Sequence, residues 1–139
     1  MVTELTIHTP GRGLHEITAD ITEVVAEVVA RTPHTPPTLC TVFVRHTSAS
    51  LIVQENADPS ARHDLEAFFD RIAPEHDPAY SHTAEGPDDM PAHIRAALTQ
   101  PSVAVPLFDG RLGLGTWQGI YLFEHRRAAH ARRVLVHLA

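Results

Sequence analysis

The alternation of hydrophobic and polar side chains predicts several short strands. Leu5 and Ile7 alternate with polar neighbours near the start of the chain, and the closing segment repeats this pattern. A period of two residues turns one set of side chains to a buried face, as in a strand with one exposed face. Together with runs of β-branched residues, the pattern predicts strands over residues 3–8, 14–17, 38–45, 50–53, 102–107, 118–123 and 133–138.

Three other segments have hydrophobic residues at helical spacing. We expect Thr18 to cap the first helix, which prolines end from Pro33 onward, and Asp58 to cap the second, which ends before Pro74. A short third helix is predicted over 90–98. Strands and about three helices without regular β–α–β alternation indicate an α+β fold with mostly antiparallel sheets, in one domain over 1–139.

Composition narrows the class of protein further. The single cysteine, Cys40, lies in an apolar run, so the chain forms no intramolecular disulfide and we expect a buried, inert thiol. No segment reaches the roughly 18 apolar residues of a membrane span, and the start of the chain has no signal-peptide pattern. We therefore expect a cytoplasmic protein that has no membrane partner.

Charge indicates which ligands the chain favours. The formal net charge of −6 argues against a general nucleic-acid or anionic-membrane binder. Every basic residue other than histidine is arginine, so a phosphate would meet guanidinium groups. The 11 histidines offer many metal ligands and proton carriers.

The segment between the second and third helices carries the strongest candidate site. Residues 73–91 have no periodicity, and an ordered loop of this length in a small domain is often functional. Asp89 and His93 are four residues apart and would share one helix face, onto which His82 and Glu85 could fold back. This donor set suits a divalent ion such as zinc, whereas carboxylates and water alone would suit magnesium. The alternative is a helix start decorated with acids, which explains Asp89 but neither histidine.

Four other polar groups are candidates with structural alternatives. His46 lies at a strand end beside hydroxyl residues, and Asp64 lies on the polar side of the second helix, where a solvated face would explain it. Residues 109–119 form a glycine-rich turn that could cradle phosphate, although hairpin geometry also needs glycine. His125 and Arg126 end a strand, where polar residues are often plain surface.

Short polar motifs follow one another along most of the chain. They are His46-Thr-Ser-Ala-Ser50, Glu55-Asn56, Asp58-Pro59, Arg62-His63-Asp64, His82, Glu85-Gly86, Asp88-Asp89-Met90-Pro91, His93-Ile94, Gly115-Thr-Trp-Gln-Gly119 and Glu124-His125-Arg126. Their combination closely resembles the YjbQ family, also described as secondary thiamine-phosphate synthases, over nearly the whole chain. The resemblance implies strands packed as a sandwich, a homotrimer with sites near the subunit boundaries, and a weak synthase activity that joins a pyrimidine-methyl diphosphate to a thiazole phosphate and releases pyrophosphate.

This resemblance assigns expected roles to the candidates. The proposed metal ligands are histidines, namely His46, His82, His93 and His125. The carboxylates expected to serve as further ligands or acid–base groups are Asp64, Glu85 and Asp89. The residues expected to bind a small phosphorylated substrate are Arg111, Thr116, Trp117, Gln118 and Arg126.

Two other functions fit the same polar residues. One is a metal-dependent hydrolase of a phosphorylated or acyl metabolite, with metal-bound water as the nucleophile. The other is a trimeric module that binds an anionic metabolite without converting it.

Overall fold

The computed structural model describes all residues from 1 to 139. It contains eight strands and three helices, which confirms the predicted α+β class. In chain order the elements are β1 (Val2–Thr9), β2 (Gly13–Glu16), α1 (Thr18–Arg31), β3 (Leu39–Val44), β4 (Ala49–Glu55), α2 (Pro59–Ile72), α3 (Asp89–Leu98), β5 (Ser102–Phe108), β6 (Arg111–Leu112), β7 (Gln118–Glu124) and β8 (His130–Leu138).

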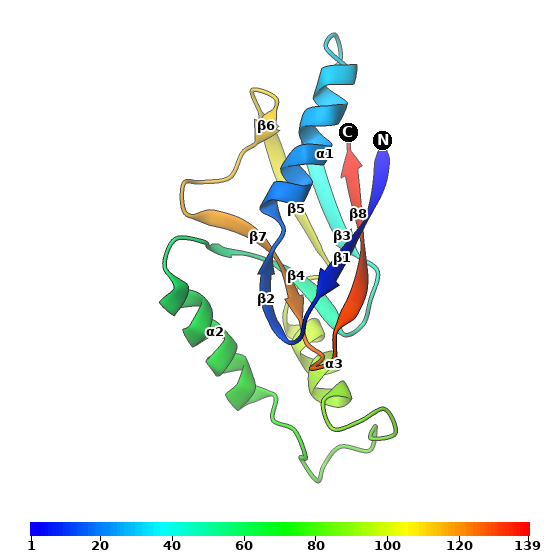
Figure 1. Ribbon diagram of the computed structural model, residues 1–139, viewed down its shortest axis with the longest axis vertical. Coiled ribbons are helices and arrows are strands. Elements are labelled where there is room, and N and C mark those ends of the chain that lie inside the picture. Colours follow the sequence, from blue (N-terminus) through cyan, green and yellow to red (C-terminus); the bar gives the residue numbers. More distant parts are fainter.

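The strands form two antiparallel sheets. The larger sheet has the order β1-β8-β3-β5-β6, and the smaller has the order β2-β7-β4. An isolated bridge between Leu51 and Gln100 links β4 to the segment before β5. Both termini lie at one end of the elongated molecule, and α3 lies at the other end (Figure 1).

One hydrophobic core joins α1 to both sheets. Val42 of β3, Val136 of β8 and Leu51 of β4 are fully buried in it, together with Ile21 of α1. The period of two in each strand brings these side chains to a shared interior, because alternate residues face opposite sides of a sheet. The expected packing of strands into a sandwich is therefore confirmed.

The first helix starts as predicted, but its cap differs. The expectation that Thr18 caps α1 is wrong, because Ile17 occupies the cap position and Thr18 is the first helical residue. The Thr18 hydroxyl instead accepts a hydrogen bond from the Ile120 amide at 2.9 Å. The side chain thus connects α1 to β7 rather than closing its own helix.

The second helix is capped as the sequence predicts. The Asp58 carboxylate accepts a hydrogen bond from the Ser60 amide at 2.9 Å, and Pro59 occupies the first turn. Proline fits there because this position needs no hydrogen-bonded amide. The helix runs along the side of the molecule (Figure 1) and buries Phe69 in a smaller cluster with Tyr121 and Phe123.

Residues 73–88 connect α2 to α3 without a helix or strand. This segment crosses the end of the molecule and enters α3 at Asp89 (Figure 1). None of the three helices is both long and apolar enough to cross a membrane.

Candidate functional site

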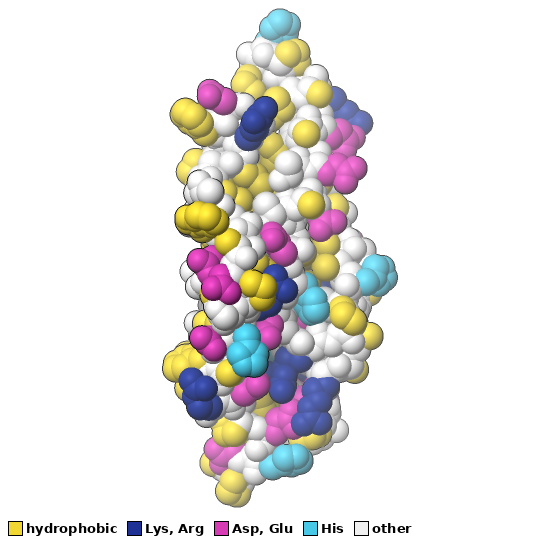
Figure 2. Space-filling model, turned by 60° about the vertical axis from the view of Figure 1, so that its left-hand side comes forward, with side chains coloured by type: hydrophobic (Ala, Val, Ile, Leu, Met, Phe, Trp, Pro, Cys, Tyr) yellow, Lys and Arg dark blue, Asp and Glu magenta, His cyan; other side chains and the backbone are white.

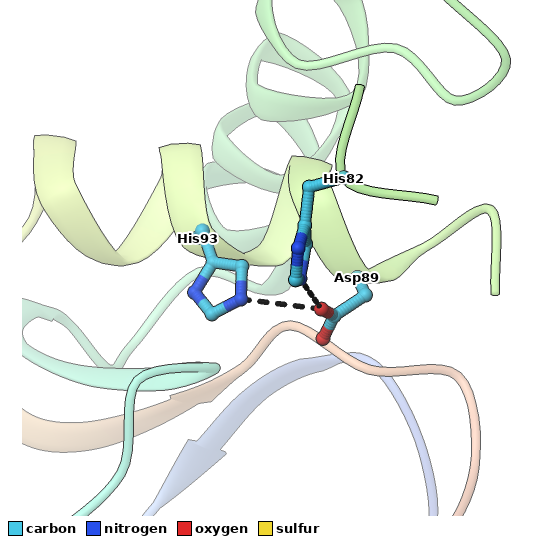
Figure 3. A group of neighbouring side chains, drawn as sticks. All are labelled: His82, Asp89 and His93. Carbon is cyan, nitrogen blue, oxygen red and sulfur yellow. Dashed lines mark hydrogen bonds and ion pairs between the residues drawn. The ribbon is translucent and has the colours of Figure 1, made fainter. Parts of the chain in front are cut away.

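The predicted loop and helix bring two histidines to one carboxylate. Asp89 and His93 are four residues apart on α3, and His82 folds back from the preceding loop (Figure 3). Asp89 Oδ2 lies 2.6 Å from His82 Nε2 and 3.2 Å from His93 Nε2. The three potential ligand atoms lie within 4.8 Å of one another.

This donor set fits a zinc-type divalent ion. Ligand atoms about 2 Å from a tetrahedral ion lie about 3.3 Å apart. The 3.2 Å between Asp89 Oδ2 and His93 Nε2 matches this spacing, whereas the 2.6 Å to His82 Nε2 is a direct hydrogen bond that a bound ion would replace. The Asp89 side chain is 3% exposed, whereas His82 and His93 are 47% and 33% exposed. Two imidazoles and one carboxylate would supply three ligands to such an ion and leave a fourth position for water or substrate, as in catalytic zinc sites.

Arg126 determines how the Asp89 carboxylate is turned. Its Nη1 donates to Asp89 Oδ1 at 2.7 Å, its Nε donates to Asp88 Oδ2 at 3.1 Å, and its Nη2 donates to the Glu85 carbonyl at 2.9 Å. These bonds leave Oδ2 for the two histidines. Arg126, predicted to bind phosphate, instead holds the start of α3 and the preceding loop together in this structure.

The surrounding charges keep Asp89 ionised. Burial by itself would raise the pKa of this carboxyl, but the hydrogen bond with His82 and the positive charge of Arg126 lower it below its ordinary value. An ionised carboxylate is the form that binds metals. Glu85 lies at the rim, 66% exposed, with its Oε2 atom 3.9 Å from His82 Nε2.

The other two predicted metal ligands lie apart from this cluster. His46 Nε2 accepts a hydrogen bond from the Arg133 amide at 2.8 Å. Burial and the positive charge of Arg132 lower the His46 pKa. The fully buried His125 directs Nε2 to Ser50 Oγ at 2.8 Å. The structure therefore assembles the site from His82 and His93 without His46 and His125.

Apart from Arg126, which contacts Asp89, the predicted substrate residues are separated from the histidine cluster within one chain. Thr116 and Trp117 precede β7, Arg111 lies on β6, and Gln118 opens β7. Since a strand rises about 3.3 Å per residue, Gln118 lies about 20 Å along β7 from the end near α3. Trp117 is 63% exposed, and Gln118 Oε1 accepts a hydrogen bond from the Gly115 amide at 2.8 Å. Asp64 lies on α2 and pairs with none of the cluster residues.

Sequence reasoning missed a buried ion pair behind the site. Arg132 of β8 donates to both carboxylate oxygens of Glu124, from Nη2 at 2.5 Å and from Nε at 2.7 Å. Burial by itself would raise the Glu124 pKa, but hydrogen bonds from Arg132, Arg126 and Thr9 lower it. The alternation along β8 could have revealed this pair, because the alternate positions that bury Val134 and Val136 also bury Arg132.

Charged and hydrophobic side chains are unevenly distributed over one face of the molecule. On the face shown in Figure 2, arginine, carboxylate and histidine side chains gather in the lower half, and hydrophobic side chains are more frequent above. The fold and the site together define a small α+β protein with a partly exposed His–Asp–His cluster at one end of a two-sheet sandwich.

Comparison with known proteins places the chain in a family. Residues 3–139 match the family described as UPF0047 protein YjbQ-like, and the chain belongs to this family. A UPF0047 protein of Synechocystis is 53% identical over 135 residues, which cover 97% of this chain and 88% of the relative. The UPF0047 protein YjbQ of Escherichia coli O157:H7 is 41% identical over 134 residues, covering 96% and 94% of the two chains.

Solved structures agree with the fold. The conserved hypothetical protein TT1486 of Thermus thermophilus superposes with a TM-score of 0.84 at 33% identity, covering 99% of both chains. The hypothetical protein APE1520 of Aeropyrum pernix also has a TM-score of 0.84, at 26% identity, covering 100% of this chain and 98% of that one. The predicted family and architecture are therefore confirmed.

Proposed function

We propose that the protein is a divalent-metal-dependent enzyme that acts on a small phosphorylated metabolite at the His82–Asp89–His93 cluster. The observation that carries this proposal is the convergence of two partly exposed histidine side chains on one oxygen of a buried carboxylate. A purely structural role would not require both histidines to face solvent.

The residues around the cluster have separate tasks in this proposal. His82, Asp89 and His93 hold the ion, and Arg126 fixes the orientation of Asp89. A bound divalent ion supplies a Lewis acid that stabilises negative charge on a phosphate group. Two imidazole ligands favour zinc over magnesium, which prefers oxygen ligands. Glu85, exposed beside His82, is placed to take up or release a proton of the substrate.

The specific reaction that we propose is a weak thiamine-phosphate synthase activity. A carbon–oxygen bond of the pyrimidine-methyl diphosphate breaks, a carbon–nitrogen bond to the thiazole phosphate forms, and pyrophosphate leaves. The leaving group gains negative charge, which positively charged groups in a preorganised site stabilise. This proposal rests on the family resemblance and on a site whose chemistry suits a departing phosphate.

We further propose that the active form is a homotrimer whose subunits share the site. Arg111, Thr116, Trp117 and Gln118 are remote from the histidine cluster within one chain. They would reach a substrate bound there only from a neighbouring copy. This arrangement would combine the metal cluster of one subunit with the glycine-rich turn of another.

Product detection by mass spectrometry tests the activity. The parent and the His93→Ala variant are incubated with both substrates and zinc or magnesium, beside the His34→Ala variant, whose exposed histidine lies far from the site. We expect thiamine phosphate from the parent and the control and its loss in His93→Ala. Release of free phosphate without coupling would instead assign a hydrolase, and no turnover by folded parent would contradict both enzymes.

Zinc binding tests the metal site independently of turnover. Calorimetry should show zinc bound by the parent and binding lost in His93→Ala. Arg126→Gln should weaken zinc binding by about tenfold, because it removes the hydrogen bonds that orient Asp89. Arg127→Gln is the matched control, since Arg127 is 57% exposed and its side chain pairs with Glu75 instead. Equal zinc affinity in all four proteins would contradict the metal site.

A further inference from the structure

A polar pocket separate from the histidine cluster lies on another face of α3. Arg95 follows His93 by two residues and therefore points away from the Asp89–His93 face. It lines a pocket of about 220 Å³ between α2, β2 and β7. The pocket is lined by Arg12, Gly13, Glu66, Phe69, Asp70, Arg95 and Phe123.

Arg95 is buried and has too few partners. Its side chain is 3% exposed, yet only Nη2 forms hydrogen bonds, to Asp70 Oδ1 at 3.0 Å and to the Ala73 carbonyl at 3.3 Å. The Nε atom is buried without a partner, and Nη1 donates to no atom of the chain. A buried donor without an acceptor costs about 1–3 kcal/mol, so a guanidinium in this state favours an acceptor from outside the chain.

The two arginines of the pocket share their carboxylate partners with each other and with Arg127. Arg12 Nη2 lies 3.4 Å from the same Asp70 Oδ1 that contacts Arg95, so two guanidinium groups share one carboxylate oxygen. Burial and the nearby Arg12 charge lower the Arg95 pKa. Glu75 contacts Arg12 but also pairs with Arg127. Asp70 itself is 53% exposed, so solvent weakens its attraction for both arginines.

Glu66 limits how much negative charge a ligand in this pocket can carry. Glu66 also lines the pocket, and its Oε1 accepts a hydrogen bond from the Leu14 amide at 2.7 Å. It forms no ion pair with either arginine, but its negative charge would oppose a multiply charged anion. The rings of Phe69 and Phe123 form an apolar wall in edge-to-face contact, with centroids 5.2 Å apart. The pocket therefore suits a small, singly charged oxyanion with an apolar substituent.

We propose that this pocket binds the carboxylate of a small molecule between Arg12 and Arg95. The ligand oxygens accept hydrogen bonds from the free donors of the two guanidinium groups and take over the position that Asp70 now holds. Charge-assisted hydrogen bonds of this kind are the strong ones in proteins. The site is separate from the histidine cluster and does not depend on a bound metal.

The experiment is an NMR titration of the arginine Nε–H signals with sodium acetate. Sodium chloride at the same ionic strength is the reference, and sodium phosphate is a second arm. The Arg95→Gln variant assigns the signal. We expect saturable movement of the Arg95 signal with acetate, weaker binding of the more highly charged phosphate, and no saturable movement with chloride. An equal response to chloride and acetate would overturn the proposal.

Two variants at the pocket rim give opposite predictions. Arg12→Gln should weaken acetate binding by about tenfold, because it removes one charged donor. Asp70→Asn should strengthen binding several-fold, because it removes the competing negative charge. Arg31→Gln and Asp20→Asn on α1 are matched controls that should bind acetate as the parent does. Weaker binding in Asp70→Asn, or unchanged binding in Arg12→Gln, would contradict the site.

His93→Ala separates this proposal from the proposed function. The variant loses a metal ligand but keeps every residue that lines the pocket. Acetate binding should therefore persist in it while zinc binding is lost. Loss of acetate binding in a folded His93→Ala protein would show that the two sites are not independent.

Discussion

The two oxygens of Asp89 have different partners, and this division creates the site. Oδ1 accepts from Arg126, while Oδ2 faces His82 and His93. A free carboxylate would rotate between such partners, whereas one held on Oδ1 keeps Oδ2 directed at the imidazoles. The orientation of Asp89 thus depends on Arg126, which lies 37 positions further along the chain.

His125 shows how the fold changes the chemistry of one residue. Burial and the charge of Arg95 lower its pKa from 6.5 to about 3. Its Nδ1 atom is buried without a hydrogen-bond partner. The ring therefore stays neutral at physiological pH, and protonating it would place a charge in a closed site beside arginines.

This shift predicts a pH dependence of stability. The unfolded chain takes up a proton on His125 near pH 6.5, whereas the folded chain does so only near pH 3. The unfolded state therefore binds more protons in this range, and stability falls as the pH is lowered. The slope from this residue approaches about 1.4 kcal/mol per pH unit.

Urea unfolding between about pH 6.5 and 5.0 measures this slope. His125→Gln should reduce it by the contribution of one proton, even though the variant is less stable at every pH. His34→Gln should retain the parent slope, because that histidine is exposed. A parent and a His125→Gln variant with the same slope would show that His125 titrates normally in the fold.

At the scale of elements, the segment before α3 positions His82 against the helix. Gly86 has a φ of 104°, a backbone conformation that side chains rarely adopt. A Cβ at this position would lie 3.3 Å from Asp88 Oδ1. The carbonyl of the preceding residue, Glu85, accepts a hydrogen bond from Arg126, which also binds Asp89. The turn is therefore hydrogen-bonded to the residue that orients the Asp89 carboxylate.

Gly86→Ala is therefore expected to weaken both the turn and the metal site. The positive φ should cost about 1–3 kcal/mol of unfolding free energy, and zinc affinity should fall because His82 belongs to the segment that this turn joins to α3. Urea unfolding and calorimetry give the two values. Gly115→Ala is the control, since Gly115 lacks a positive φ and its nearest neighbour is the flexible Gln118 side chain. Unchanged zinc affinity in Gly86→Ala would show that the turn does not position His82.

At the scale of the whole molecule, one sheet exposes apolar side chains. Cys40, Val42 and Val44 of β3 face the core, so Leu39 and Phe43 face outward, where they are 39% and 43% exposed. Exposed apolar residues on a sheet face are typical of an interface between subunits. This surface supports the homotrimer proposed above.

Light scattering at micromolar concentration checks the assembly. We expect three times the 15.3 kDa mass of one chain. Phe43→Glu should lower this mass, because it would place a charge in the proposed interface, whereas His34→Glu should leave it unchanged. The mass of a monomer for the parent protein would contradict the trimer.

Mixing inactive variants then tests whether subunits share the site. His93→Ala and Trp117→Ala should each lose synthase activity, and subunit exchange between them should restore part of it. Restoration requires that the metal cluster and the glycine-rich turn act from different chains. If the mixture stays inactive after subunit exchange has been demonstrated, each site takes its metal cluster and its glycine-rich turn from the same subunit.

Local sequence patterns predicted most of the secondary structure and part of the candidate site. The periods of 2 and 3.6 residues located the three helices and seven of the eight strands, but not the two-residue strand β6. The spacing of four between Asp89 and His93 placed both on one face of a helix. The proline and aspartate at the start of α2 also predicted its cap. These features depend on neighbours within one or two turns, so the amino-acid order alone determined them.

Only the tertiary structure decided which distant groups meet. His82 joins Asp89 because the loop folds back, whereas His46 and His125 bond to the Arg133 amide and to Ser50. Arg126 holds Asp89 across 37 positions instead of standing free for a phosphate. Such contacts depend on how two sheets and three helices pack together, and residue spacing along the chain does not specify that packing. The sequence therefore determined the elements and the helical half of the site, and the packing of the core selected its remaining members.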